Sequence, residues 1–136
     1  MSVQSINNPL EKPSIIVRTQ KVRDYQKVVF IGKLVYGQTE SAKKQAYELL
    51  EDASGYIFDI RQLDSIDSTG FGVLINIGKK INQLNRSMAI IVENGWIKEL
   101  LHIAKFQLIF PIAHAEEEAL AFLQKNHQPL LRFDEY

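Results

Sequence analysis

Apolar residues along this chain alternate between strand-like and helical spacing, and this alternation is the strongest indication of its fold. The runs, taken in order and marked β for strand-like or α for helical spacing, are β 14–22, β 27–35, α 39–52, β 56–60, α 70–84, β 87–93, α 95–106, β 107–112 and α 115–125. The first two runs suit an antiparallel hairpin, and the later alternation indicates parallel crossovers. The chain is therefore predicted to be a single-domain α/β protein: a mixed, mostly parallel β-sheet of about five strands with four helices packed on it.

The two ends of the chain lack this periodicity. Residues 1–13 are polar, contain two prolines and are expected to form a loose N-terminal leader. Residues 126–136 have no clear period and are treated as a C-terminal tail. The predicted domain spans residues 14–125, which is long enough to bury a hydrophobic core.

Charge and composition exclude several classes of function. Sixteen basic residues balance sixteen acidic ones, and no basic stripe indicates nucleic-acid binding. The absence of cysteine excludes disulfides, thiol catalysis and cysteine-ligated zinc. No apolar run approaches the ~18 residues of a membrane span, and no secretory signal precedes the domain, so we expect a cytoplasmic protein without direct membrane insertion.

Helical spacing also predicts which side chains face the core. We expect Leu49 and Leu84 to point inward. Trp96, just after Gly95, is weighed separately and is expected to be a core contact under its helix rather than an exposed binding anchor. Pro111 has no N–H group and is expected to keep the run 107–112 at a sheet edge or to end it.

A cluster of small polar residues, Asp67-Ser68-Thr69-Gly70, lies between a strand-like and a helical run. The first turn of a helix has unpaired N–H groups and a partial positive charge, which Asp67 or Ser68 can cap. The same field favours an added anion, so a phosphate on Ser68 would place negative charge where the fold tolerates it. Gly70 and Gly72 allow close approach of backbone or a partner. From spacing alone, simple helix capping remains the alternative interpretation.

The stretch DIRQLDSIDSTGFGVLI, residues 59–75, resembles the signature of STAS domains, the anti-sigma factor antagonist family. In that family an apolar strand ending in Asp leads to Asp-Ser-Ser/Thr-Gly-hydrophobic-Gly; the matching residues here are Asp59, Asp67, Ser68, Thr69, Gly70, Phe71 and Gly72. The order of elements also matches over residues 14–125, and GKLVYGQTESA, residues 32–42, resembles the family's segment before its first helix. The resemblance implies a STAS-like fold.

The resemblance further implies that Ser68 is the phosphoacceptor, with Thr69 as second choice, and that Asp67 orients the hydroxyl. It implies a serine/threonine kinase that is itself the anti-sigma factor and releases the antagonist on phosphorylating it. A PP2C-type phosphatase would restore the antagonist. The chain would then be a non-enzymatic partner-switching regulator of transcription, with no catalytic residues, no cofactor and no metal site.

Two departures from the family pattern bear on the partner. Val35 stands where the family has an acid after Gly-x-Leu, which would remove a polar contact near Ser68. Ala104-Lys105-Phe106 replaces a small-Gly-Leu triplet. The alternative function is a STAS scaffold or accessory subunit of a stress-signalling assembly or membrane transporter, and a homodimer stays open. An enzyme acting through Ser68 is the weakest interpretation, because no base has a recognisable relation to it.

The histidines and the acidic run are interpreted as structural. His102, His114 and His127 lie far apart without acids at ligand spacing, so they are predicted to be surface or packing residues rather than metal ligands. The acidic residues 116–118 are predicted to form the solvated first turn of a helix.

Overall fold

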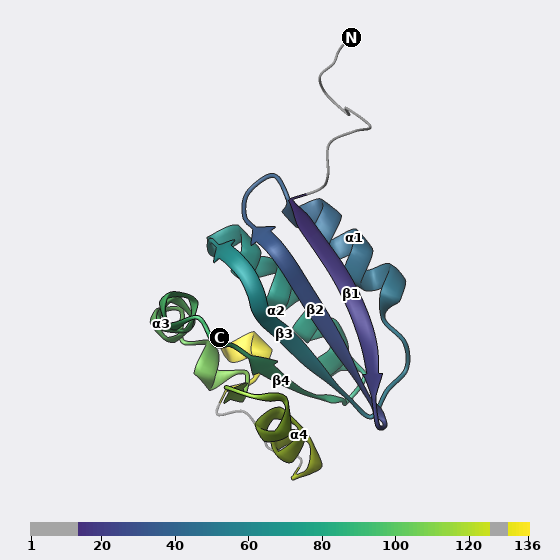
Figure 1. Cartoon of the computed structure of the whole chain (residues 1–136). Helices are drawn as coiled ribbons and strands as arrows, with labels where there is room; N and C mark the ends of the chain where they lie inside the picture. The colour runs from purple at the N-terminus through teal and green to yellow at the C-terminus, as the bar shows by residue number, and fades with distance from the viewer. Residues whose placement is uncertain (1–13, 126–130) are drawn as a thin grey trace.

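One mixed five-stranded sheet forms the centre of the computed structural model, which describes residues 14–125 and 131–136. Its spatial order is β1-β2-β3-β4-β5; β1 and β2 are antiparallel, and the other neighbours are parallel (Figure 1). The strands are β1 (Ile15–Val22), β2 (Tyr25–Leu34), β3 (Gly55–Ile66), β4 (Ser87–Ile91) and β5 (Ile112–Ala113).

Helices cover the two faces of this sheet unequally. α1, α2 and α3 pack on one face, and α4 packs on the other; in Figure 1, α1 and α2 lie behind the sheet. The helical elements are α1 (Thr39–Leu49), α2 (Ser68–Gln83), α3 (Gly95–Ile103), α4 (Glu116–Gln124) and the short 3-10 helices η1 (Phe106–Leu108) and η2 (Phe133–Glu135). Because β3 lies between two covered faces, residues 55–60 are all buried, which explains their lack of polar alternation.

The larger core lies between the sheet and the helices α1, α2 and α3. Its aromatic rings form a chain of contacts: Phe30 to Phe58 at 6.2 Å, Phe58 to Phe110 at 5.8 Å and Phe110 to Phe106 at 5.4 Å between centroids. These edge, tilted and stacked contacts anchor the middle of β3 through Phe58. The C-terminal part of β3 then continues past β4, because β4 pairs only with residues 55–59 of β3 whereas β2 pairs with β3 as far as Ile66.

The predicted fold class and the order of elements are confirmed. The predicted edge strand is present, but its predicted bounds, 107–112, are wrong. Phe106, Ile109 and Phe110 instead turn into the core through η1, where the N–H of Phe110 donates to the carbonyl of Phe106 at 2.8 Å. Ile109 and Phe110 lie three and four residues after Phe106, which is a helical spacing. It is not evident in the sequence because the neighbouring residues are also apolar. Only Ile112–Ala113 joins the sheet, just after Pro111.

Several predicted core contacts are also wrong. Trp96 is 66% exposed: the next residue, Ile97, is fully buried, so Trp96 lies on the outward side of α3. Leu84, the C-cap of α2, is 56% exposed because the inward face of the helix ends before it. Leu49, in the last turn of α1, is 38% exposed for the same reason. Amphipathic spacing identifies a face but does not identify where along the helix its packing ends.

Residues 131–136 pack against the domain although their sequence has no period. Phe133 is buried, and its ring meets Phe110 edge-on at 5.4 Å. A Cβ added at Gly78 would lie 2.8 Å from the Phe133 ring, so the bare backbone of α2 provides the room for it. The hydroxyl of Tyr136 donates to the carbonyl of Ala104, beside the end of α3.

A helix that crosses a bilayer needs about 20 consecutive, mostly apolar residues. None of the helices in the described part of the chain is both long and apolar enough to cross a bilayer.

Candidate functional site

The polar cluster lies where β3 ends and α2 begins. Asp67 is the N-cap of α2, with extended backbone, and Ser68 is the first helical residue. The carbonyl of Asp67 accepts from the N–H of Phe71 at 3.0 Å, which closes the first turn. The helix therefore starts two residues before Gly70, the position at which helical spacing begins in the sequence.

The carboxylate of Asp67 holds three groups together. Its Oδ1 accepts from the Thr69 hydroxyl at 2.6 Å and from the Gly70 N–H at 3.0 Å, and its Oδ2 accepts from the Tyr36 N–H at 2.9 Å. Asp67 thus caps α2 and also ties it to the loop that joins β2 to α1. The Thr69 hydroxyl, together with the N–H groups of Tyr36 and Gly70, outweighs desolvation and lowers the pKa of the Asp67 carboxyl.

The lowered pKa predicts an acid-dependent loss of stability. The carboxyl binds its proton more weakly in the folded chain than in the unfolded one, so its contribution is present above its ordinary pKa and disappears as pH falls. Asp67→Asn keeps one capping oxygen but removes the titration. Urea unfolding of both proteins is expected to show a wild-type advantage at neutral pH that shrinks between about pH 5 and pH 2. A difference independent of pH would contradict the assignment.

The two hydroxyls of the cluster are placed differently. The side chain of Thr69 is exposed but donates its hydroxyl hydrogen to Asp67. Ser68 is also exposed, and among the described residues none forms a hydrogen bond with its hydroxyl. The structure therefore leaves Ser68 as the free hydroxyl at the helix start, which is consistent with its being the first choice over Thr69.

The glycines of the motif have distinct surroundings. A Cβ added at Gly70 would lie 2.1 Å from the carbonyl oxygen of Leu34, so α2 packs directly on the end of β2 at this point. A Cβ added at Gly72 would meet nothing within 4 Å. Gly72 lies four residues after Ser68 and so shares its helix face, where it offers bare backbone to a neighbouring molecule. Phe71 is half-buried and contacts Phe106 at 5.1 Å between ring centroids.

Asp59 is not brought to this cluster. It is buried in the middle of β3, and its carboxylate accepts three hydrogen bonds from Arg61: from the backbone N–H to Oδ1 at 3.1 Å, from Nε to Oδ1 at 3.0 Å and from Nη2 to Oδ2 at 2.8 Å. At about 3.3 Å per strand residue, the remaining length of β3 separates it from Asp67. Its bonds with Arg61 satisfy a buried charge, and we find no direct contact with the turn.

Sequence reasoning missed the contribution of the loop before α1. The Tyr36 N–H that reaches Asp67 is a backbone group, and the Asp67 N–H in turn donates to the Leu34 carbonyl at 3.4 Å. Val35 therefore does not break the connection between this loop and the turn, because backbone atoms make it. The Gly-x-Leu segment at residues 32–34 was the available signal, since it marks the end of β2.

The other residues considered from sequence lie apart from the cluster. His102 is exposed on α3, and His114 Nε2 lies 3.1 Å from Lys98 Nζ; His127 lies outside the described residues. In the acidic run, Glu116 pairs with Lys27 at 2.6 Å. Within residues 14–125 and 131–136, no three His, Asp or Glu side chains are grouped so as to hold a metal ion.

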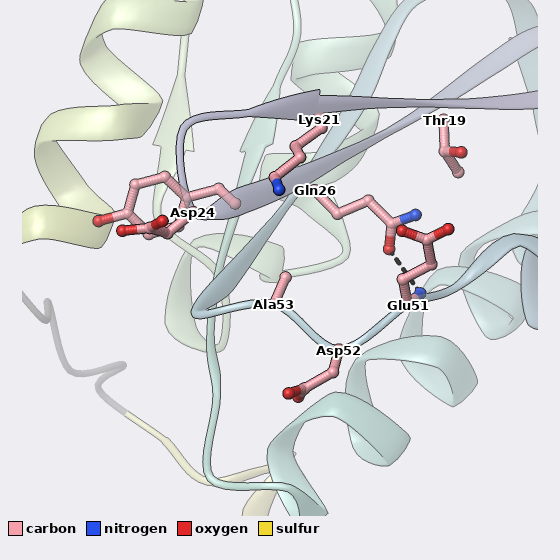
Figure 2. Close-up of a pocket in the computed structure, with 8 residues that line it drawn as sticks. Thr19, Lys21, Asp24, Gln26, Glu51, Asp52 and Ala53 are labelled. Carbon is pink, nitrogen blue, oxygen red and sulfur yellow. Dashed lines mark hydrogen bonds between the residues drawn. The ribbon is translucent and has the colours of Figure 1, made fainter.

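A polar pocket of about 300 Å³ lies at the other end of the sheet, beside the β1–β2 turn and the loop after α1 (Figure 2). The buried amide of Gln26 forms one wall; its oxygen accepts from the Glu51 N–H at 2.9 Å, and its nitrogen donates to the Leu49 carbonyl at 2.8 Å. Both polar atoms of Gln26 are thus used to hold the loop. The pocket is remote from Ser68 and shares no lining residue with the cluster.

Comparison with known proteins identifies the family of this chain. Residues 17–119, most of the chain, match the family model described as STAS domain. The chain belongs to the STAS family. This STAS domain is 29% identical over 65 residues to BtrV of Bordetella bronchiseptica, which is named as a candidate anti-sigma factor antagonist. That match covers 48% of this chain and 56% of BtrV.

Solved structures show the same fold. An anti-sigma factor antagonist from Mycobacterium paratuberculosis matches this STAS domain with a TM-score of 0.71 at 16% identity, over 84% of this chain and 97% of that one. SpoIIAA of Bacillus has been solved in unphosphorylated and phosphorylated forms. These forms match with TM-scores of 0.64 and 0.57 at 13% and 14% identity, over 81% and 78% of this chain and 97% of SpoIIAA. The family and fold inferred from the motif are therefore confirmed.

Proposed function

We propose that this STAS protein is an anti-sigma factor antagonist that works by partner switching and is controlled by phosphorylation of Ser68. One observation carries the proposal: Ser68 presents an exposed hydroxyl without a partner in the described structure, at the first residue of a helix that Asp67 already caps. The neighbouring Thr69 hydroxyl is engaged by Asp67 and is the less suitable acceptor. That SpoIIAA exists in a phosphorylated form supports the same chemistry here.

The helix start can carry the added charge. A phosphate brings about −1.5 to −2 charges at neutral pH, and the N-terminal field of α2 favours it. The nearby carboxylate of Asp67 opposes it, but three donors already compensate that charge. The two effects oppose each other, so the fold is expected to persist while the surface at Ser68 becomes strongly negative.

This change acts on a surface suited to close contact. Ser68 and Gly72 lie on one face of α2, and Gly72 has open space around it. A partner that approaches the bare backbone there would meet the phosphate at short range. Repulsion between like charges, together with the loss of close approach to the backbone, would then release the partner.

The proposed partners are an anti-sigma factor that is also a serine/threonine kinase, and a PP2C-type phosphatase that reverses the modification. In this scheme the STAS protein is a cytoplasmic, non-enzymatic regulator. The unmodified form binds the anti-sigma factor and so frees the sigma factor. The phosphorylated form dissociates from the anti-sigma factor.

Direct phosphorylation tests the proposal. The full chain is incubated with ATP and an anti-sigma-type serine kinase from the same organism, and the modified residue is mapped by mass spectrometry. We expect phosphate on Ser68, retained in Thr69→Ala and lost in Ser68→Ala. Phosphate on neither hydroxyl, with the kinase active on a control substrate, would overturn the proposal.

Binding to the same kinase provides a second prediction. Ser68→Asp is expected to bind at least about tenfold more weakly than wild type, which is ~1.4 kcal/mol, while Ser68→Ala binds as wild type does. Calorimetry measures both, and thermal unfolding shows that both variants are folded. Equal affinities for Ser68→Asp and Ser68→Ala would contradict the proposed switch.

A further inference from the structure

A groove of about 540 Å³ runs between the outer faces of α1 and α2. Four lysines line it: Lys43 and Lys44 from α1, and Lys79 and Lys80 from α2. Because α1 follows β2 and α2 follows β3, and those strands are parallel neighbours, both helices start at the same edge of the sheet and run side by side (Figure 1). The two lysine pairs therefore face a common groove.

Both helices present this groove with the same residue spacing. On α1 the lysine pair lies between Glu40 and Tyr47, and on α2 the corresponding positions are Asn76 and Gln83. Positions separated by three, four and seven residues share one helix face. The groove is thus formed by two matching faces rather than by chance proximity of long side chains.

Carboxylates do little to neutralise this groove. Glu40 pairs with Lys43 at 2.9 Å, but it is 87% exposed, so the pair is weak. Lys80 lies 5.4 Å from the centre of the Tyr47 ring. In the described part of the chain, no carboxylate forms a salt bridge with Lys44, Lys79 or Lys80.

The four lysines concentrate positive charge in one place. The chain as a whole has equal numbers of acidic and basic residues, so the gathering of four lysines in one groove does not reflect a basic protein. Like charges on neighbouring faces repel each other. A concave surface of one sign also concentrates ions of the opposite sign.

We propose that the α1–α2 groove is a docking site for an acidic segment of a protein partner. The ammonium groups of Lys44 and Lys79, free of ion pairs, would bind carboxylates, and the amides of Asn76 and Gln83 can hydrogen-bond the segment. Its position between two helices that run side by side suits an extended peptide segment.

This site goes beyond the proposed phosphorylation switch and does not rest on it. Asn76 lies eight residues after Ser68, about 12 Å further along α2. Binding in the groove is therefore expected in Ser68→Ala as well as in wild type. Failure of phosphorylation and failure of groove binding would be separate results.

Titration of the isotope-labelled full chain tests the site. The probe is an octapeptide of glutamate, added at about 20 mM ionic strength so that exposed charges are not screened. We expect amide shifts confined to residues 40–47 and 76–83, reversed by about 500 mM salt. An octapeptide of glutamine should produce none.

Charge reversal provides the matched comparison. The double variant Lys44→Glu/Lys79→Glu is expected to bind the glutamate peptide at least about tenfold more weakly than wild type. The control Lys33→Glu/Lys125→Glu reverses two exposed lysines outside the groove and is expected to bind the peptide as wild type does. Thermal unfolding establishes that both are folded. Shifts that are absent or spread over unrelated lysines would overturn the proposal. Tighter lysine-dependent binding to phosphatidylserine vesicles than to the peptide would also overturn it.

Discussion

Gly70→Ala is expected to lower the free energy of unfolding by about 2–4 kcal/mol, although it adds only one methyl group. The added Cβ would lie 2.1 Å from the Leu34 carbonyl oxygen and 2.8 Å from Cγ1 of Ile66. The first contact is with backbone at the end of β2, which cannot move without disturbing the sheet. The clash outweighs the gain of up to about 1 kcal/mol that alanine normally brings to a helix interior.

Gly72→Ala is the matched control. It lies in the same helix two residues later, where the added Cβ meets nothing within 4 Å. We expect it to leave stability unchanged or to raise it by up to about 1 kcal/mol. Urea unfolding followed by circular dichroism measures both variants, and equal stabilities would contradict the close packing of α2 on β2.

Phe133→Ala is expected to destabilise the protein by about 3 kcal/mol. The ring is buried, meets Phe110 at 5.4 Å and fills the space above the bare backbone of Gly78. Its removal leaves a cavity beside the larger core. Arg132→Ala changes the exposed neighbour and should alter stability by no more than about 0.5 kcal/mol.

The same contact can be tested from the side of α2. In a chain that keeps Phe133, the Cβ added by Gly78→Ala would lie 2.8 Å from the Phe133 ring and 2.9 Å from the Phe110 ring, so one ring or both must shift. We expect the loss of unfolding free energy caused by Gly78→Ala to be about 1 kcal/mol smaller when Phe133 is already alanine. A negligible effect of Phe133→Ala, with additive behaviour of the two changes, would show that residues 131–136 do not stabilise the domain.

Much of the site followed from local sequence. The change from strand to helical spacing located the turn, and Asp67 could be identified as a cap because a side-chain oxygen there reaches the first N–H groups of the helix. The family motif then selected Ser68. The choice of Ser68 as phosphoacceptor stays a prediction. The turn and the Asp67 cap could be inferred because periodicity and capping depend on residues within a few positions of one another.

Other features of the site could not be derived in this way. Gly70 and Gly72 look equivalent in the sequence, yet one packs against β2 and the other has open space around it. Thr69 and Ser68 look interchangeable, yet one hydroxyl is bound to Asp67. Asp59 and Asp67 belong to one motif, but Asp59 lies in the middle of β3 and Asp67 directly follows its last residue.

For the fold as a whole, the spacing of apolar residues was sufficient to obtain the α/β class and the order of strands and helices, because each element buries its own repeating face. Spacing was not sufficient for residues 106–113, for Trp96 or for Phe133, whose burial depends on what the rest of the chain places beside them. The lysine groove has the same origin. Each helix carries an ordinary pair of lysines, and only the parallel packing of α1 beside α2 brings the pairs together.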